Sequence, residues 1–195
     1  MTRSIVLDAS VAIPLVWQED VSAVVRRSVD RWAAEGVTLL VPTPFWEEIV
    51  NALTKRHRRP GSVVIEALYE LDQLTITSIE VDRPLLLLGL DLVERFGLTI
   101  HDAIYLALAR STGARLATFD RQLIAAAGAD AVDMWGDGAF ESGGHRLAER
   151  SAPYGAPESS ITWPTWPGAG PYLATLRRRA LVAADDANEA AIRRT

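Results

Sequence analysis

The stretch TIHDAIYLALARSTGARLATFD, residues 99–120, combines the two local patterns that decide the fold. Residues 99–113 have the apolar spacing of a helix and end at a glycine, the residue most often found just beyond a helix C-terminus. Residues 114–120 form a short apolar run that ends at an aspartate, which predicts a buried strand. A helix followed directly by a buried strand is typical of α/β proteins with a parallel sheet.

The same alternation extends over the first 135 residues. Strands are predicted at 4–8, 37–42, 74–81, 114–120 and 129–135, and helices at 10–17, 21–36, 44–59, 62–74, 84–97, 99–113 and 121–128. The strands are nearly continuous apolar runs, which predicts a parallel sheet covered by helices on both faces. The fold class is therefore α/β.

The composition changes after residue 135. Residues 136–171 are rich in Gly, Pro and Ser, a composition that resists regular structure. Residues 172–195 have helical spacing with Leu173, Leu176 and Leu181 on one side, an apolar face too thin for a stable isolated helix. The sequence thus predicts a domain over 1–135 and a Gly/Pro-rich C-terminal extension over 136–195, made of a linker and a short helix.

Composition excludes several classes of protein. The 195 residues contain no cysteine, which excludes disulfides, zinc–thiolate sites and cysteine nucleophiles and predicts a cytoplasmic location. No apolar run reaches membrane-spanning length. The formal net charge of −5 argues against a protein that coats nucleic acid without specificity, but not against an enzyme that acts on it through an acidic pocket.

Acidic residues follow the predicted strands. Asp8 and Asp120 end strands, Glu47 and Glu48 begin the helix after the strand at 37–42, and Asp102 lies in the first turn of its helix. Ligands of open parallel sheets bind at the carboxyl ends of the strands. We therefore expect these acids to gather at one edge of the sheet.

Each acid also has a simpler interpretation. Asp8 and Asp120 are placed to cap the helices that follow them, and Thr99 and Asp102 have the spacing of a capping box. Several carboxylates at one edge nevertheless repel each other unless a cation neutralises them. Oxygen-only clusters suit Mg²⁺ or Mn²⁺, and such ions assist the hydrolysis of phosphodiesters.

The motifs that carry these acids resemble a known family. In order and spacing, VLDASVAI (6–13), EIVNAL (48–53), IHDAIYLALA (100–109) and LATFD (116–120) resemble the acidic motifs of the PIN domain, most closely the VapC-like ribonucleases, toxins of type II toxin–antitoxin systems. The resemblance covers about residues 3–135. It implies a three-layer α/β/α domain, an endoribonuclease that uses Mg²⁺ or Mn²⁺ to activate a water, an antitoxin partner and a homodimer.

The resemblance also implies the site residues. The catalytic and metal-binding acids would be Asp8, Glu48, Asp102 and Asp120, and the polar residues that support them would be Ser10 and Thr118. The choice of Glu48 over Glu47 rests on the family pattern, because both glutamates border the apolar face of their helix.

Two further features leave alternatives open. The basic segment KRHRR, residues 55–59, predicts RNA contact through Arg56, Arg58 and Arg59, or simply favourable charge at a helix C-terminus. A non-catalytic PIN-like module that acts with an antitoxin on operator DNA would share the same fold and acids. A phosphatase of the haloacid-dehalogenase type would need a second acid two residues after Asp8, where the sequence has serine.

Overall fold

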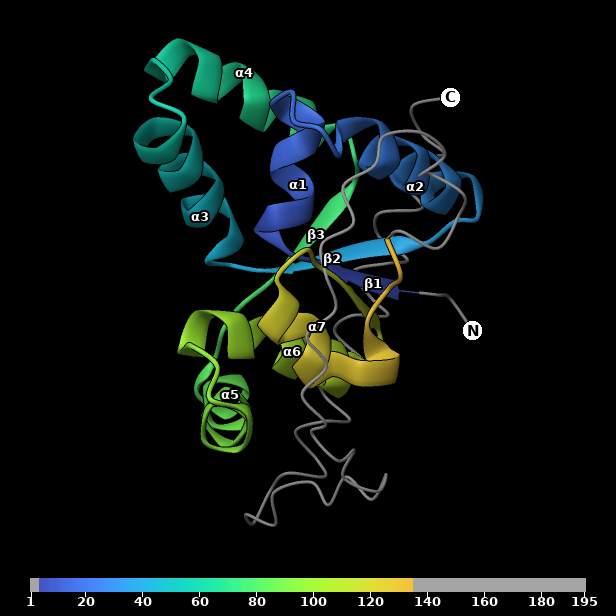
Figure 1. The fold of residues 1–195 in the computed structure, drawn as a ribbon, viewed down its shortest axis with the longest axis vertical. Helices are drawn as coiled ribbons and strands as arrows, with labels where there is room; N and C mark the ends of the chain where they lie inside the picture. Colours follow the sequence, from blue (N-terminus) through green and yellow to red (C-terminus); the bar gives the residue numbers. More distant parts are fainter. Residues whose placement is uncertain (1–3, 135–195) are drawn as a thin grey trace, which may run out of the picture.

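The computed structural model describes residues 4–134. Within this range the strands form a single sheet, shown in Figure 1, with the order β3-β2-β1-β4 and only parallel neighbours. The strands are β1 (Ser4–Leu7), β2 (Thr38–Pro42), β3 (Ile76–Ile79) and β4 (Arg115–Ala117). The predicted parallel sheet is confirmed, and the segment predicted at 74–81 is its edge strand.

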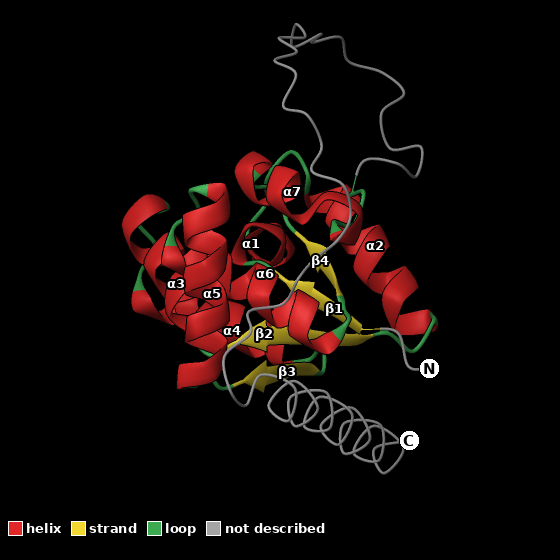
Figure 2. Cartoon of the chain, turned by 90° about the horizontal axis from the view of Figure 1, so that it is seen from below, coloured by secondary structure: helices red, strands yellow, loops and turns green. Residues whose placement is uncertain are grey.

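Helices cover both faces of this sheet. They are α1 (Ala9–Val16), α2 (Ser22–Ala34), α3 (Phe45–Asn51), α4 (Gly61–Asp72), α5 (Arg83–Phe96), α6 (Ile100–Thr112) and α7 (Arg121–Ala127). Figure 1 shows α1 to α4 on one side of the sheet and α5, α6 and α7 on the other, and Figure 2 views the sheet from the side of α5, α6 and α7. The α/β/α architecture expected from the sequence is therefore confirmed.

Helix α6, which contains the motif IHDAIYLALA (100–109), lies at the centre of its layer. All residues of α6 from Ala103 to Ala109 are buried, and α6 contacts β1, β2 and β4 as well as α5 and α7. A helix that is apolar on all sides is stable only when it is covered on all sides. Because α6 runs antiparallel to the strand β4 that follows it, its N-terminus lies at the edge where the parallel strands end.

Local signals set both ends of α5 and α6 and the start of α7. Gly97 and Gly113 adopt the left-handed conformation, with φ of 66° and 72°, and end α5 and α6. The side chains of Asp82, Thr99 and Asp120 each accept a backbone N–H at the start of α5, α6 and α7 respectively. Such caps satisfy backbone donors that the helix itself leaves free.

The structure corrects two boundaries. The helix predicted at 44–59 changes after Asn51 into a π-helical turn, η1 (Ala52–Arg56), in which the His57 N–H donates to the Ala52 carbonyl at 3.0 Å. The strand predicted at 129–135 is wrong, because a 3₁₀ turn, η2 (Gly128–Asp130), takes its place and only Ala131 pairs with β4, at Leu116.

The predicted extension at 136–195 lies outside the described residues, so the domain boundary stays a prediction. Across residues 4–134, none of the helices has the length and apolar character needed to cross a membrane.

Candidate active site

The predicted acids lie at the edge of the sheet where the strands end. Asp8 directly follows β1, and Asp120 follows the neighbouring strand β4. Glu48 lies in the first turn of α3, which follows β2, and Asp102 lies in the first turn of α6. The parallel topology thus places four acids from distant parts of the sequence at this edge.

Asp8 is the most buried of these acids, with only 8% of its surface exposed. Its Oδ2 accepts hydrogen bonds from the hydroxyls of Ser10, at 2.5 Å, and Thr118, at 2.7 Å. Burial raises the pKa of the Asp8 carboxyl, the charge of Asp102 raises it further, and the hydroxyl bonds partly oppose this shift. A cation at this position would offset the cost of the buried charge.

Ser10 and Thr118 fix the geometry around Asp8. Besides donating to Asp8, Ser10 Oγ accepts the Phe119 N–H at 3.0 Å, and Thr118 Oγ1 accepts the Asp120 N–H at 3.0 Å. The two hydroxyls therefore tie the segment between β4 and α7 to the end of β1. This arrangement agrees with the supporting role expected for both residues.

Asp120 is connected to Asp8 through Thr118, but its own carboxylate faces α7. Asp120 Oδ1 accepts the Leu123 N–H at 2.8 Å, so the side chain acts as the N-cap of α7. The residue is exposed. The simpler interpretation as a helix cap is therefore realised in the structure, next to the buried carboxylate of Asp8.

Glu48 is half-buried, and the charges of Asp8 and Asp102 affect its pKa, whereas Glu47 is exposed. We call Asp8, Glu48 and Asp102 the acidic cluster. Burial raises the pKa of Glu48, and the charges of Asp8 and Asp102 raise it further. The Tyr105 hydroxyl donates to Glu48 Oε2 at 2.6 Å and partly opposes this shift. The geometry thus separates the two glutamates that the helical pattern left equivalent.

Asp102 combines both interpretations of its position. Thr99 Oγ1 accepts the Asp102 N–H at 3.2 Å and so caps α6, and it donates to Asp102 Oδ2 at 2.7 Å. The charge of Asp102 also raises the pKa values of Asp8 and Glu48. Asp102 therefore contacts the Thr99 cap of α6 and also acts electrostatically on Asp8 and Glu48.

Tyr105 is a residue of this edge that the acidic motifs of the sequence do not single out. It follows Asp102 by three residues on α6, and residues three apart lie on the same face of a helix. Burial raises the pKa of the Tyr105 hydroxyl, and the charge of Glu48 adds to that effect. The spacing from Asp102 was a signal that the tyrosine points toward the same edge.

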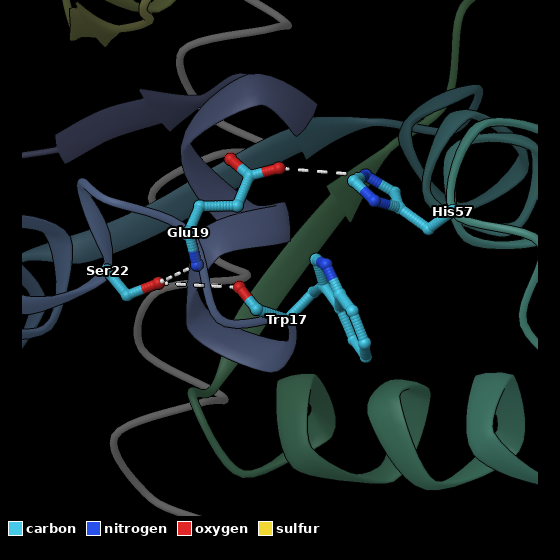
Figure 3. Close-up of polar contacts among 4 residues, drawn as sticks. All are labelled: Trp17, Glu19, Ser22 and His57. Atoms are coloured by element: carbon cyan, nitrogen blue, oxygen red, sulfur yellow. Dashed lines mark hydrogen bonds and ion pairs between the residues drawn. The ribbon is translucent and has the colours of Figure 1, made fainter.

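The basic segment lies at the end of η1, against the turn between α1 and α2. Figure 3 shows His57 Nε2 facing Glu19 Oε1, at 3.6 Å. The same turn is held by Ser22 Oγ, which accepts the Glu19 N–H at 2.8 Å and donates to the Trp17 carbonyl at 3.4 Å.

The arginines of this segment differ in their surroundings. The guanidinium of Arg59 stacks on the Trp17 ring, 3.8 Å from its centroid, whereas Arg56 and Arg58 are exposed. Arg58 also has a left-handed backbone, with φ of 51°. The segment therefore presents Arg56 and Arg58 to solvent and uses Arg59 for packing.

The acidic cluster offers the type of ligand atom that a hard divalent cation prefers. Asp8, Glu48 and Asp102 supply only oxygen donors; the charge of Asp102 raises the pKa of Asp8, and the charges of Asp8 and Asp102 raise the pKa of Glu48. In residues 4–134, no group of three or more His, Cys, Asp or Glu side chains is already arranged to hold a metal ion. Because Mg²⁺ keeps several waters and uses one or two carboxylates directly, the residues fit such an ion without a closed cage.

Comparison with known proteins defines the family. The PIN-domain model matches residues 5–129, and the chain therefore belongs to the PIN-domain family. No curated protein sequence matches it.

Solved structures share the fold. PAE2754 from Pyrobaculum aerophilum is 25% identical, with a TM-score of 0.51 over 69% of this chain and 91% of that one. A toxin–antitoxin complex from Klebsiella pneumoniae is 18% identical, with a TM-score of 0.52 over 67% and 98%. VapC20 of Mycobacterium tuberculosis, a toxin that cleaves the sarcin–ricin loop, is 19% identical, with a TM-score of 0.52 over 63% and 94%. The resemblance to the PIN domain is confirmed, and the toxin–antitoxin complex and VapC20 share its fold.

Proposed function

We propose that the protein is an endoribonuclease that depends on Mg²⁺ or Mn²⁺ and serves as the toxin of a VapBC-type toxin–antitoxin system. The observation that carries this proposal is the gathering of Asp8, Glu48 and Asp102 at the carboxyl edge of a PIN-domain sheet, where the charge of Asp102 raises the pKa of Asp8 and the charges of Asp8 and Asp102 raise the pKa of Glu48. Buried carboxylates that repel each other are stable together when a cation binds them.

In this proposal Asp8 and Asp102 are the principal metal ligands, and Glu48 and Asp120 complete the site directly or through water. The ion, when bound, makes a water more acidic and neutralises charge on the phosphate. The protein holds the acids in place through hydroxyl groups: Ser10 and Thr118 orient Asp8, Thr99 orients Asp102, and Tyr105 contacts Glu48.

The substrate and partners follow from the same proposal. Arg56 and Arg58 would contact RNA phosphates, since both are exposed, while Arg59 would support them from its position on Trp17. An antitoxin partner is supported by the structural likeness to a toxin–antitoxin complex.

A homodimer is supported by an apolar stripe on α5. Its residues Leu86, Leu87 and Leu90 are each more than 40% exposed. The absence of cysteine from the sequence supports action in the reducing cytoplasm.

The alternative is a binding module that acts with an antitoxin on operator DNA and does not cleave RNA. It would need the fold but not the buried charges of the acidic cluster, which destabilise the metal-free protein. The cost of the cluster therefore favours the enzyme.

The neighbouring glutamates give a matched test of the function. We expect purified protein to cut a structured RNA pool with Mg²⁺ or Mn²⁺ and not with EDTA. Glu48→Gln should reduce the cleavage rate roughly 10²-fold, because it removes a charge that would hold the metal, while Glu47→Gln should leave the rate nearly unchanged. Equal effects of the two substitutions, or cleavage that persists in EDTA, would refute the proposed site. Operator binding without any cleavage would support the binding module.

A further inference from the structure

The buried helix α6 carries a hydroxyl that reaches the acidic cluster. Tyr105 is only 1% exposed and is surrounded by buried residues of its own helix. Its hydroxyl donates to Glu48 Oε2 at 2.6 Å, across 57 positions of sequence. Because α3 and α6 lie on opposite faces of the sheet, this bond joins the two helical layers at the edge where the strands end (Figure 1).

A phenylalanine would fill almost the same volume in the core. The hydroxyl of a tyrosine adds nothing to apolar packing, and burying it is unfavourable unless it finds a hydrogen-bond partner. Here the partner is a carboxylate, and the bond length falls in the range of charge-assisted O–H···O⁻ bonds, about 2.5–2.7 Å. The bond therefore stabilises the Glu48 carboxylate as well as the buried hydroxyl of Tyr105.

The bond also restricts what Glu48 can do. Glu48 is half-buried, so part of its side chain borders solvent, and a free glutamate there would rotate among several conformers. Tyr105 engages Oε2, which leaves Oε1 as the oxygen for a direct contact with a cation. Asp102, on the same face of α6, approaches the cluster from the same helix.

We propose that Tyr105 is a positioning residue that holds Glu48 in the orientation required for cation binding, and so sets the affinity of the acidic cluster for Mg²⁺ or Mn²⁺. This inference rests on the proposed function, because it concerns the same metal site. Groups that orient a metal ligand typically contribute about 10–100-fold to metal affinity.

The test is the Mn²⁺ affinity of the full-length protein, measured by isothermal titration calorimetry without RNA. We expect Tyr105→Phe to weaken Mn²⁺ binding about tenfold, while the unfolding temperature without metal stays close to that of the wild type. The matched control is Tyr69→Phe on α4, whose side chain is 66% exposed, and it should change neither quantity. A purely structural tyrosine would lower the unfolding temperature and leave the affinity unchanged.

Double substitutions assign the effect to Glu48. The loss caused by Tyr105→Phe should persist in an Asp102→Asn background and disappear in a Glu48→Gln background, since coupled residues do not contribute additively. If Tyr105→Phe does not fold, Glu48→Asp replaces it, because the shorter side chain cannot keep both the tyrosine bond and its place in the cluster.

The outcomes separate this inference from the proposed function. Wild-type Mn²⁺ affinity in Tyr105→Phe, or in Glu48→Asp where that variant is used, would overturn the positioning role and leave the metal site intact. A wild-type protein that binds no Mn²⁺ would overturn the metal site and the positioning role together. Weaker binding that depends on Glu48 would establish Tyr105 as the residue that orients it.

Discussion

Asp8→Asn is expected to abolish RNA cleavage while making the metal-free protein more stable. The loss of rate should reach roughly 10³-fold, which corresponds to about 4 kcal/mol of transition-state stabilisation. The asparagine oxygen can still accept hydrogen bonds from Ser10 and Thr118, so the local structure is retained. What disappears is the negative charge that would hold the cation.

The gain in stability follows from the direction of the pKa shift. Burial raises the pKa of Asp8 in the folded protein above its ordinary value of 3.8. The folded state therefore gains stability from the protonated acid at pH values below the unfolded pKa, and this contribution is lost as the pH rises through the folded pKa. At neutral pH the wild type carries the cost of a buried charge, and Asp8→Asn does not.

Thermal unfolding at pH 7 measures the predicted gain in stability of Asp8→Asn. Without metal, the variant should unfold a few degrees above the wild type, and its unfolding temperature should depend less on pH. Addition of Mg²⁺ should raise the unfolding temperature of the wild type but not of the variant, because only a state that binds the ion is stabilised by it. A variant that keeps a tenth of the wild-type rate, or that is less stable than the metal-free wild type, would contradict the account.

Phe45→Ala is expected to produce the largest loss of stability among single substitutions near the site. Phe45 is fully buried at the start of α3 and packs edge-on against Trp46, with ring centroids 5.0 Å apart. Removal of a buried phenylalanine side chain costs about 3–5 kcal/mol, because it loses apolar burial and leaves a cavity. The unfolding temperature should fall by roughly 10 °C.

Urea unfolding measures this effect directly. The midpoint should shift to lower urea with an unchanged slope, as expected when a native contact is lost. The control is Tyr69→Ala, which removes a large aromatic side chain that is 66% exposed and should change the free energy of unfolding by less than about 0.5 kcal/mol. A comparable loss in both variants would mean that the core does not lie where the structure places it.

Most of the fold could be predicted from local sequence signals. The glycines at 97 and 113 end their helices in the left-handed conformation, and Thr99 caps α6 as its spacing with Asp102 indicates. Apolar runs such as SIVL in β1 become buried parallel strands. These features depend on neighbouring residues only, so the sequence displays them directly.

Features that depend on distant contacts could not be predicted. The π-helical turn η1 lies where the chain leaves α3, and Arg59, three residues beyond it, packs on Trp17 at the end of α1. The short strand expected at 129–135 reduces to a single bridge, because η2 occupies the residues before Ala131. Pairing of this kind is set by tertiary geometry rather than by composition.

The candidate site shows the same division. The carboxyl ends of parallel strands lie at the same edge of a sheet, so the gathering of the acids at one edge could be expected from the sequence. The helical pattern alone does not separate Glu47 from Glu48, and the choice of Glu48 comes from the family resemblance. The contact of Tyr105 with Glu48 could not be predicted, because it depends on how two helical layers face each other. Asp102 shows that a residue bonded to a helix cap can also belong to an acidic cluster.

The central claim is that the carboxylates at this edge bind a divalent cation that cleaves RNA, and Asp102 tests it most directly. The measurement is the rate of RNA cleavage by the wild type and Asp102→Asn in Mn²⁺ and in EDTA. In the variant the Asp102 N–H still donates to Thr99, so α6 keeps its cap and a loss of rate reflects the missing charge. We predict cleavage in Mn²⁺ only, reduced about 10²-fold in the variant. Equal cleavage by both proteins would contradict the account and leave the Asp102 carboxylate with only its contact to the Thr99 cap.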